Sequence, residues 1–115
     1  AWAETTGYLD VKDPWISMAK TYGQIILNNN LKHRLDLMKK MIKTYSVDGM
    51  VMHSTRSCKP YSVGQFDLRK AITADLDLPA VILDADIADE RVWSEQQIHT
   101  RLEAFCETLE GSKFG

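Results

Sequence analysis

The chain has 115 residues, a net charge of −2 and 26% charged side chains. This length predicts one domain that buries roughly two-thirds of the surface of its unfolded chain. The balanced charge, without a basic block, argues against nucleic acid as a partner. No apolar run approaches the roughly 20 residues of a membrane helix, and residues 1–4 (AWAE) lack the pattern of a signal peptide. We expect a cytoplasmic chain that was processed or cut from a longer one, because it has no initiator Met.

The first half of the chain predicts two helices, after residues 1–12, which show no clear period. Asp13 and Pro14 suit an N-cap and the first helical position. Apolar residues follow at helical spacing at Trp15, Met18, Ala19, Tyr22, Ile25 and Ile26. Residues 28–30 (NNN) predict a turn, since asparagine tolerates left-handed backbone. A second helix begins near Asn30, with a core-facing stripe of Leu31, Leu35, Met38, Met41, Ile42 and Tyr45.

The second half predicts two strands that alternate with two helices. Short, continuously apolar runs at residues 49–53 and 80–83 are typical of strands covered on both faces. Between them, a helix over residues 61–74 is outlined by Val63, Phe66, Leu68, Ala71 and Ile72. The last helix begins at Ser94, where Gln97 completes a capping box, and ends at Gly111. We expect it to bury Ile98, Leu102, Phe105, Cys106 and Leu109.

The order of these elements predicts an α/β fold. The two strands and the helix between them form a βαβ unit, whose crossover should be right-handed. We therefore expect a Rossmann-like or flavodoxin-like domain with three layers, in which helices flank a short parallel sheet. Residues 1–115 would form this single domain. Further strands would come from residues 1–12 or from a part of the protein outside this sequence.

The stretch richest in reactive groups is residues 53–65 (HSTRSCKPYSVGQ), here called the Cys58 loop. It leaves the first strand, and an acidic loop, residues 84–91 (DADIADER), leaves the second. Parallel sheets bind ligands at the carboxyl ends of their strands. We therefore expect the two loops to face each other across a crevice. In the acidic loop, Asp84 and Asp86 would orient the basic loop, bind a cation, or only make turns and caps.

Cys58 is the sharpest candidate in this loop. Arg56, Lys59 and the helix start near Pro60 all favour its thiolate, as a nucleophile or a metal ligand. The alternative is an inert, half-buried thiol. A cysteine phosphatase needs arginine six positions after its cysteine, and Gly64 stands there, which argues against that class. The only other cysteine, Cys106, is expected in the core, with both thiols reduced.

Other polar residues of the Cys58 loop have open roles. His53 is a candidate catalytic residue together with Ser54, although it would equally cap the sheet through a hydrogen bond. The hydroxyls of the loop would donate to an anion or close the loop: Ser54, Thr55, Ser57 and Ser62. The two histidines outside the loop, His33 and His99, fall on helical faces and are expected in solvent.

The Cys58 loop resembles the 2-hydroxyacyl-CoA dehydratase and ATP-dependent benzoyl-CoA reductase family. The likeness continues upstream in residues 27–31 (LNNNL) and 45–49 (YSVDG). Downstream it includes residues 83–87 (LDADI), 89–91 (DER) and 94–101 (SEQQIHTR), so that it covers about residues 22–109. The resemblance implies an oxygen-sensitive oxidoreductase or lyase of anaerobic metabolism. It implies radical chemistry in which an acyl-CoA forms a ketyl radical or an aromatic ring is reduced.

The resemblance also implies cofactors, partners and roles for residues. Cys58 matches one ligand of a 4Fe–4S cluster, whose ordinary ligands are thiolates. Arg56, Lys59 and Tyr61 would contact the acyl-CoA substrate, unless Arg56 and Lys59 instead tune the charge of the cluster. The partners would be a related second subunit and an ATP-dependent activator that donates electrons. Family subunits are longer and carry more cysteines, so this chain would be a C-terminal domain that holds no stable cluster alone. Two other readings remain: an anion- or CoA-binding module without catalysis, and a thiol redox protein that uses Cys58.

Overall fold

The computed structural model describes the backbone of residues 6–114. It is a mixed α/β structure in which two parallel strands, β1 (Met50–Thr55) and β2 (Ala80–Ala85), form the sheet of the described part. They pair in register from Met50 opposite Ala80 to Thr55 opposite Ala85. The predicted strands are confirmed, and each runs two residues further than expected. A strand from the start of the chain is not found within Thr6–Tyr8, which form a short 3-10 helix, η1; residues 1–5 lie outside the described part.

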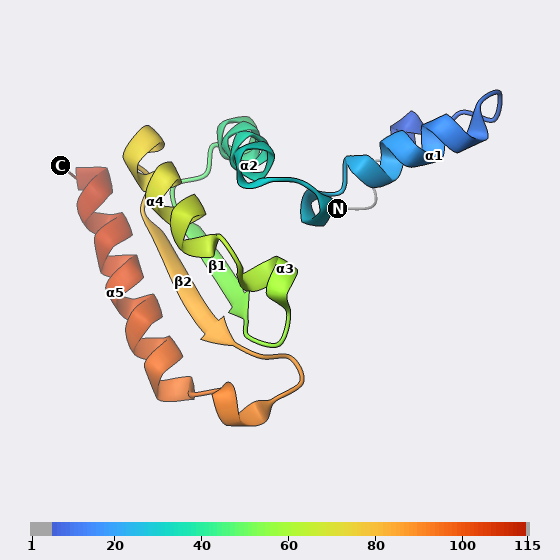
Figure 1. The fold of residues 1–115 in the computed structure, drawn as a ribbon. Coiled ribbons are helices and arrows are strands. Elements are labelled where there is room, and N and C mark those ends of the chain that lie inside the picture. Colours follow the sequence, from blue (N-terminus) through green and yellow to red (C-terminus); the bar gives the residue numbers. More distant parts are fainter. Residues whose placement is uncertain (1–5, 115) are drawn as a thin grey trace.

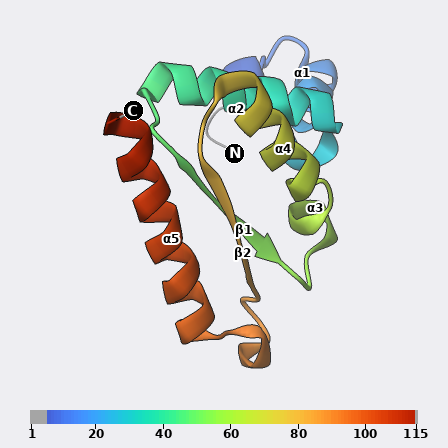
Figure 2. The same cartoon turned by 90° about the vertical axis from the view of Figure 1, so that its left-hand side faces the viewer.

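Helices cover both faces of this sheet, which gives the expected three layers. The connection between the strands holds α3 (Lys59–Ser62) and α4 (Gln65–Leu76), and α4 packs against β2 and against α2 (Leu31–Tyr45). Figures 1 and 2 show α5 (Glu95–Phe114) on the opposite side of the sheet from α4. The short 3-10 helices η2 (Ile26–Asn28) and η3 (Glu90–Val92) precede α2 and α5. The α/β class is therefore confirmed.

The core lies between the sheet and the helices α2 and α4. Met52, Leu68 and Ile82 form its buried cluster, onto which three partly buried side chains pack: Leu35, Met38 and Met50. Leu68 and Ile72 of α4 are fully buried, as the helical period predicted. On the other face, Gly49 allows α5 to come close, because a Cβ there would collide with Leu109 and Phe105.

Helix α2 begins where the sequence placed it. The side chain of Asn30 caps it by accepting a hydrogen bond from the backbone N–H of His33 at 3.0 Å. Its predicted stripe is only partly buried, because Leu31, Met41 and Tyr45 remain exposed. No described helix combines the length and the apolar character needed to cross a membrane.

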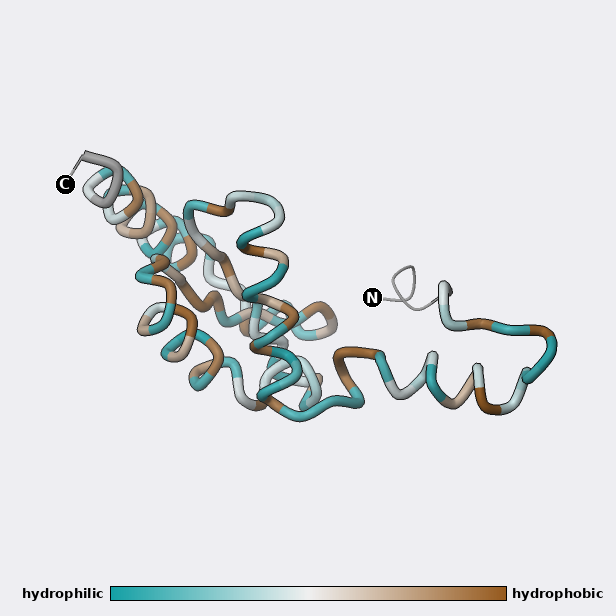
Figure 3. Tube along the Cα trace, turned by 90° about the horizontal axis from the view of Figure 1, so that it is seen from above, coloured by the Kyte–Doolittle hydropathy of each residue, from teal (hydrophilic) through white to brown (hydrophobic). Residues whose placement is uncertain are grey.

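Helix α1 (Pro14–Gly23) begins at the predicted residue but does not bury the predicted face. Trp15 is 80% exposed, and Met18 and Tyr22 are exposed as well, whereas Ser17 and Thr21 are buried. The reason is its position: α1 packs mainly on η1 and extends away from the sheet (Figures 1 and 3). The radius of gyration, 17.0 Å, accordingly exceeds the roughly 13 Å of a compact domain of this size.

The helix predicted over residues 61–74 is two helices instead of one. Gly64 separates α3 from α4 with a φ of +80°, a left-handed conformation that favours glycine. Val63, just before the break, is extended and 64% exposed, and Phe66 is 71% exposed. Neither therefore joins the core, because the break turns this part of the stripe outward.

Two predictions for helix α5 are wrong. It continues through Gly111 to Phe114, so residues 112–114 are helical and do not form a tail. Cys106 is exposed and does not belong to the core. It follows Phe105, which faces the sheet, and one residue on a helix turns the side chain by about 100°.

Candidate functional site at the carboxyl ends of the strands

The Cys58 loop and the acidic loop meet beyond the carboxyl ends of β1 and β2, as expected (Figure 1). The carboxylate of Asp86 accepts two hydrogen bonds from Ser57: one from the backbone N–H at 2.6 Å and one from the hydroxyl at 2.9 Å. Next to it, the N–H of Arg56 donates to the carbonyl of Ala85 at 3.3 Å, which continues the ladder of the sheet. The two loops are thus joined directly.

The contact between the loops differs in kind from the basic-to-acidic pairing that the sequence suggested. Asp86 uses neutral donors of Ser57, and Asp89 pairs with Arg91 of its own loop, with Nη2 to Oδ2 at 2.8 Å. Asp84 lies instead with Arg56 at a small cavity of about 70 Å³. Of the two candidates from the sequence, Asp84 and Asp86, it is therefore Asp86 that orients the Cys58 loop.

Hydrogen bonds also set the ionisation of the acidic loop. The N–H of Ala88, followed by the hydroxyl and the N–H of Ser57, lowers the pKa of the Asp86 carboxyl below its usual 3.8. The side chain of Arg91, followed by its N–H, lowers the pKa of Asp89, and Asp89 in turn raises the pKa of Arg91. Both carboxylates therefore stay ionised down to a lower pH than free aspartate.

Cys58 is a half-buried free thiol at the N-cap position of α3. Its N–H donates to the carbonyl of Thr55 at 3.1 Å, and its carbonyl accepts from the hydroxyl of Ser62 at 3.1 Å. Helix α3 has only 4 residues. Because the helix dipole grows from aligned peptide units, the positive helix end beside Cys58 is smaller than the sequence suggested.

Gln65 closes the Cys58 loop from the side of α4, a role that the sequence did not reveal. Its Nε2 donates to the carbonyl of His53 at 2.8 Å and also to the carbonyl of Tyr61. The side chain is only 7% exposed, because Gln65 shares one face of α4 with Leu68 and Ile72. That helical spacing of a glutamine with two buried apolar residues is the signal that could have identified it.

The remaining predicted site residues lie around this loop with different exposure. Ser54 is half-buried in β1, and His53 is exposed, with Nδ1 at 3.4 Å from the hydroxyl of Thr55. The side chains expected to contact the substrate are all exposed: Arg56, Lys59 and Tyr61. Within residues 6–114, no three side chains of His, Cys, Asp or Glu gather in a way that could hold a metal ion.

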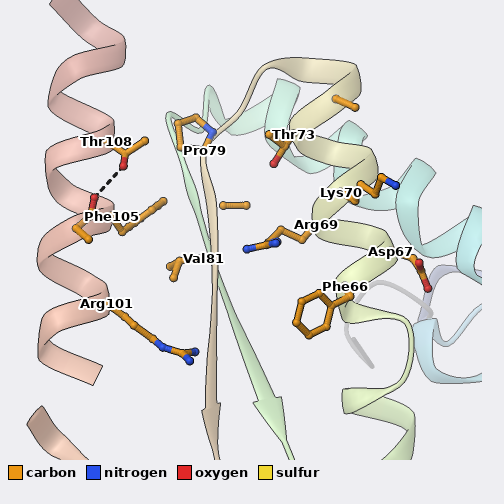
Figure 4. A pocket seen from close by; sticks show the side chains of 13 residues that line it. Phe66, Asp67, Arg69, Lys70, Thr73, Pro79, Val81, Arg101, Phe105 and Thr108 are labelled. Atoms are coloured by element: carbon orange, nitrogen blue, oxygen red, sulfur yellow. Dashed lines mark hydrogen bonds between the residues drawn. The ribbon is translucent and has the colours of Figure 1, made fainter. Parts of the chain in front are cut away.

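A cavity of about 810 Å³ lies elsewhere. Figure 4 shows it along β2 between α4 and α5, where Val81 separates Phe66, Arg69 and Lys70 from Arg101, Phe105 and Thr108. Arg101 Nη1 donates to the carbonyl of Ile82 at 3.1 Å. The carbonyls of Pro79 and Ala85 point at β1, so the alternating carbonyl of Ile82 points to the outer edge. The groove therefore follows the free edge of the sheet and is mainly apolar.

The chain matches a family model and several known proteins. The family model described as "2-hydroxyglutaryl-CoA dehydratase, D-component" matches residues 1–109. The chain is 29% identical over 106 residues to a benzoyl-CoA reductase subunit of Thauera aromatica, covering 92% of the chain and 24% of that protein. It is 34% identical over 96 residues to the lactoyl-CoA dehydratase alpha subunit of Anaerotignum propionicum, covering 84% and 23%.

A third relative extends the match over nearly the whole chain. The (R)-phenyllactyl-CoA dehydratase alpha subunit of Clostridium sporogenes is 30% identical over 114 residues, which is 97% of the chain and 27% of that protein. The chain thus spans about a quarter of the length of these relatives. All three are named as subunits, and the two dehydratases are named as alpha subunits.

Proposed function

Because the chain belongs to the 2-hydroxyglutaryl-CoA dehydratase, D-component family, we propose that it is the C-terminal domain of an iron–sulfur acyl-CoA enzyme subunit. The whole enzyme would perform radical chemistry on an acyl-CoA, either dehydration of a 2-hydroxyacyl-CoA or reduction of an aryl-CoA. The names of the relatives include both reactions. Those names also favour a related second subunit as partner, and an ATP-dependent activator would supply the electrons.

The position of Cys58 carries this proposal. It is a free, half-buried thiol at the carboxyl end of two parallel strands, where this kind of sheet binds ligands. Thiolates are the ordinary ligands of a 4Fe–4S cluster. Cys58 would be one ligand of such a cluster, and the other ligands would come from outside this chain. When bound, the cluster supplies a low-potential electron to the substrate.

The side chains around Cys58 fit the binding of an acyl-CoA. Arg56 and Lys59 are exposed cations that precede and follow Cys58 in the sequence, so they would bind the CoA phosphates or the thioester oxygen. Tyr61 is exposed in α3 and would contact the same substrate. His53 and Ser54 stand at the end of β1 and are the candidates for moving a proton during the reaction.

The two cysteines provide a matched test in the full-length subunit, purified without oxygen and assayed for turnover together with its partner subunit and the activator. Cys58→Ala should lose most of the bound iron and sulfide and all measurable turnover, because one cluster thiolate is missing. Cys106→Ala changes an exposed thiol on α5 and should keep both. An iron and sulfide content of Cys58→Ala equal to that of the parent protein would overturn the proposal.

A further inference from the structure

The peptide units beside Cys58 are held by one residue outside the Cys58 loop, Asp86, and by one bond within the loop. Asp86, which follows β2, accepts the N–H and the hydroxyl of Ser57 at 2.6 and 2.9 Å, and the N–H of Ala88 at 2.9 Å. The next N–H, that of Cys58, donates to the carbonyl of Thr55. Both peptide units that flank Ser57 are therefore held, one of them by a carboxylate, which is a strong acceptor.

Gln65 provides a second attachment on the other side of the thiol. Its two bonds join the carbonyl of His53, in β1, to the carbonyl of Tyr61, in α3. Its Oε1 is buried and has no hydrogen-bond partner within the described residues. Buried polar atoms are normally paired, and an apolar side chain would pack at this position without leaving such an atom. Compared with an apolar side chain, Gln65 therefore contributes only the two hydrogen bonds that its Nε2 donates.

We propose that Asp86 and Gln65 are positioning residues that hold the Cys58 thiol at one fixed place for the metal. This inference deepens the function proposed above and depends on it for its chemical meaning. Asp86 attaches the loop to the exit of β2, and Gln65, the last residue of the loop and the first of α4, ties the end of β1 to α3. The backbone around Cys58 is then set by the sheet and by α4 before any ligand binds, so the thiolate does not have to be ordered during assembly.

Hydrogen exchange in the full-length subunit tests the attachment itself. We expect the peptide that covers residues 53–65 to exchange about tenfold faster or more in Asp86→Ala, because two bonds to Ser57 are lost. Gln65→Leu, which replaces the amide by an apolar side chain and removes both donated bonds, should also exchange faster there. Asp89→Asn is the matched control: it alters a carboxylate of the same acidic loop whose partner is Arg91. It should leave the exchange of residues 53–65 unchanged.

The electron paramagnetic resonance spectrum of the reduced cluster tests positioning. Asp86→Ala and Ser57→Ala should retain iron but show shifted or broadened signals, while Asp89→Asn keeps the parent spectrum. Ser57→Ala leaves the charge of Asp86 in place and removes only one bond, so a spectral change in it does not arise from lost charge. It also serves as the milder variant if Asp86→Ala fails to fold.

The outcomes separate the two proposals. Unchanged exchange of residues 53–65 in both Asp86→Ala and Gln65→Leu overturns the attachment. Faster exchange with a parent-like spectrum in Asp86→Ala and Ser57→Ala overturns positioning and leaves only a structural role. Parent-like iron content in Cys58→Ala, together with faster exchange in Asp86→Ala, overturns the cluster function while the attachment of the loop is supported.

Discussion

Helices α1 and α4 carry similar apolar spacing, yet they end in opposite environments. In α4, Leu68 and Ile72 are completely buried against the sheet, whereas in α1 the predicted core residue Trp15 is 80% exposed. The difference does not come from the helical period, which both carry, although α4 begins four residues after the predicted start and α1 ends at Gly23, before the end of its predicted stripe. It comes from what lies opposite: α4 lies between β2 and α2, while α1 packs mainly on η1. A helical period therefore identifies a face that needs a partner, but not whether the partner is present.

The largest effect should come from the buried face of α4. Leu68→Ala should lower the free energy of unfolding by about 2–5 kcal/mol, because it leaves a cavity in the cluster with Met52 and Ile82. Urea unfolding measures this change. Phe66→Ala on the same helix is the control, since its side chain is 71% exposed. If both variants lost the same stability, the burial contrast within α4 would be wrong.

A smaller effect should appear on acidification, at the loops that join the strands. The folded pKa of Asp86 is lowered below 3.8, so its hydrogen bonds stabilise the protein above that pH and are lost as pH falls through the folded pKa. In this range the unfolded chain binds more protons, so stability rises with pH. The difference in unfolding free energy between the parent and Asp86→Asn should therefore be constant near neutral pH and shrink below about 4.

A neighbouring carboxylate, Asp84, is the control for this pH dependence. Asp84→Asn removes an exposed carboxylate of β2, two residues before Asp86, and is measured beside Asp86→Asn. Thermal unfolding at a series of pH values between neutral and acidic would measure both. A difference for Asp86→Asn that grew on acidification would contradict the sign of the shifted pKa.

The smallest effect should come from α1. Trp15→Ser should change the unfolding free energy of this chain by no more than about 0.5 kcal/mol, because the side chain is largely in solvent. The same urea experiment applies, with Leu68→Ala as the reference for a buried site. A loss comparable to that of Leu68→Ala would mean that α1 packs on the body of the domain, and the contrast between the helices would disappear.

Local signals predicted much of the fold, and neighbours explain where they failed. The cap at Asn30, the proline at the start of α1 and the apolar strands act within a few residues, and all lie where expected. The break at Gly64 was missed because a glycine within a helical pattern is tolerated unless the backbone needs a positive φ. Cys106 was misplaced because one position along a helix separates a face toward the sheet from a face toward solvent.

By itself, the sequence determined the order of the elements, the parallel βαβ unit and the end of the sheet at which the Cys58 loop and the acidic loop meet. It also provided Cys58 as the candidate ligand, through the resemblance of its loop to a family that the comparisons support. Only the tertiary structure decided which donors meet which acceptors. Asp86 binds Ser57, 29 positions away, and Gln65 reaches back to His53. Such contacts depend on strand register and helix orientation, which no local pattern specifies.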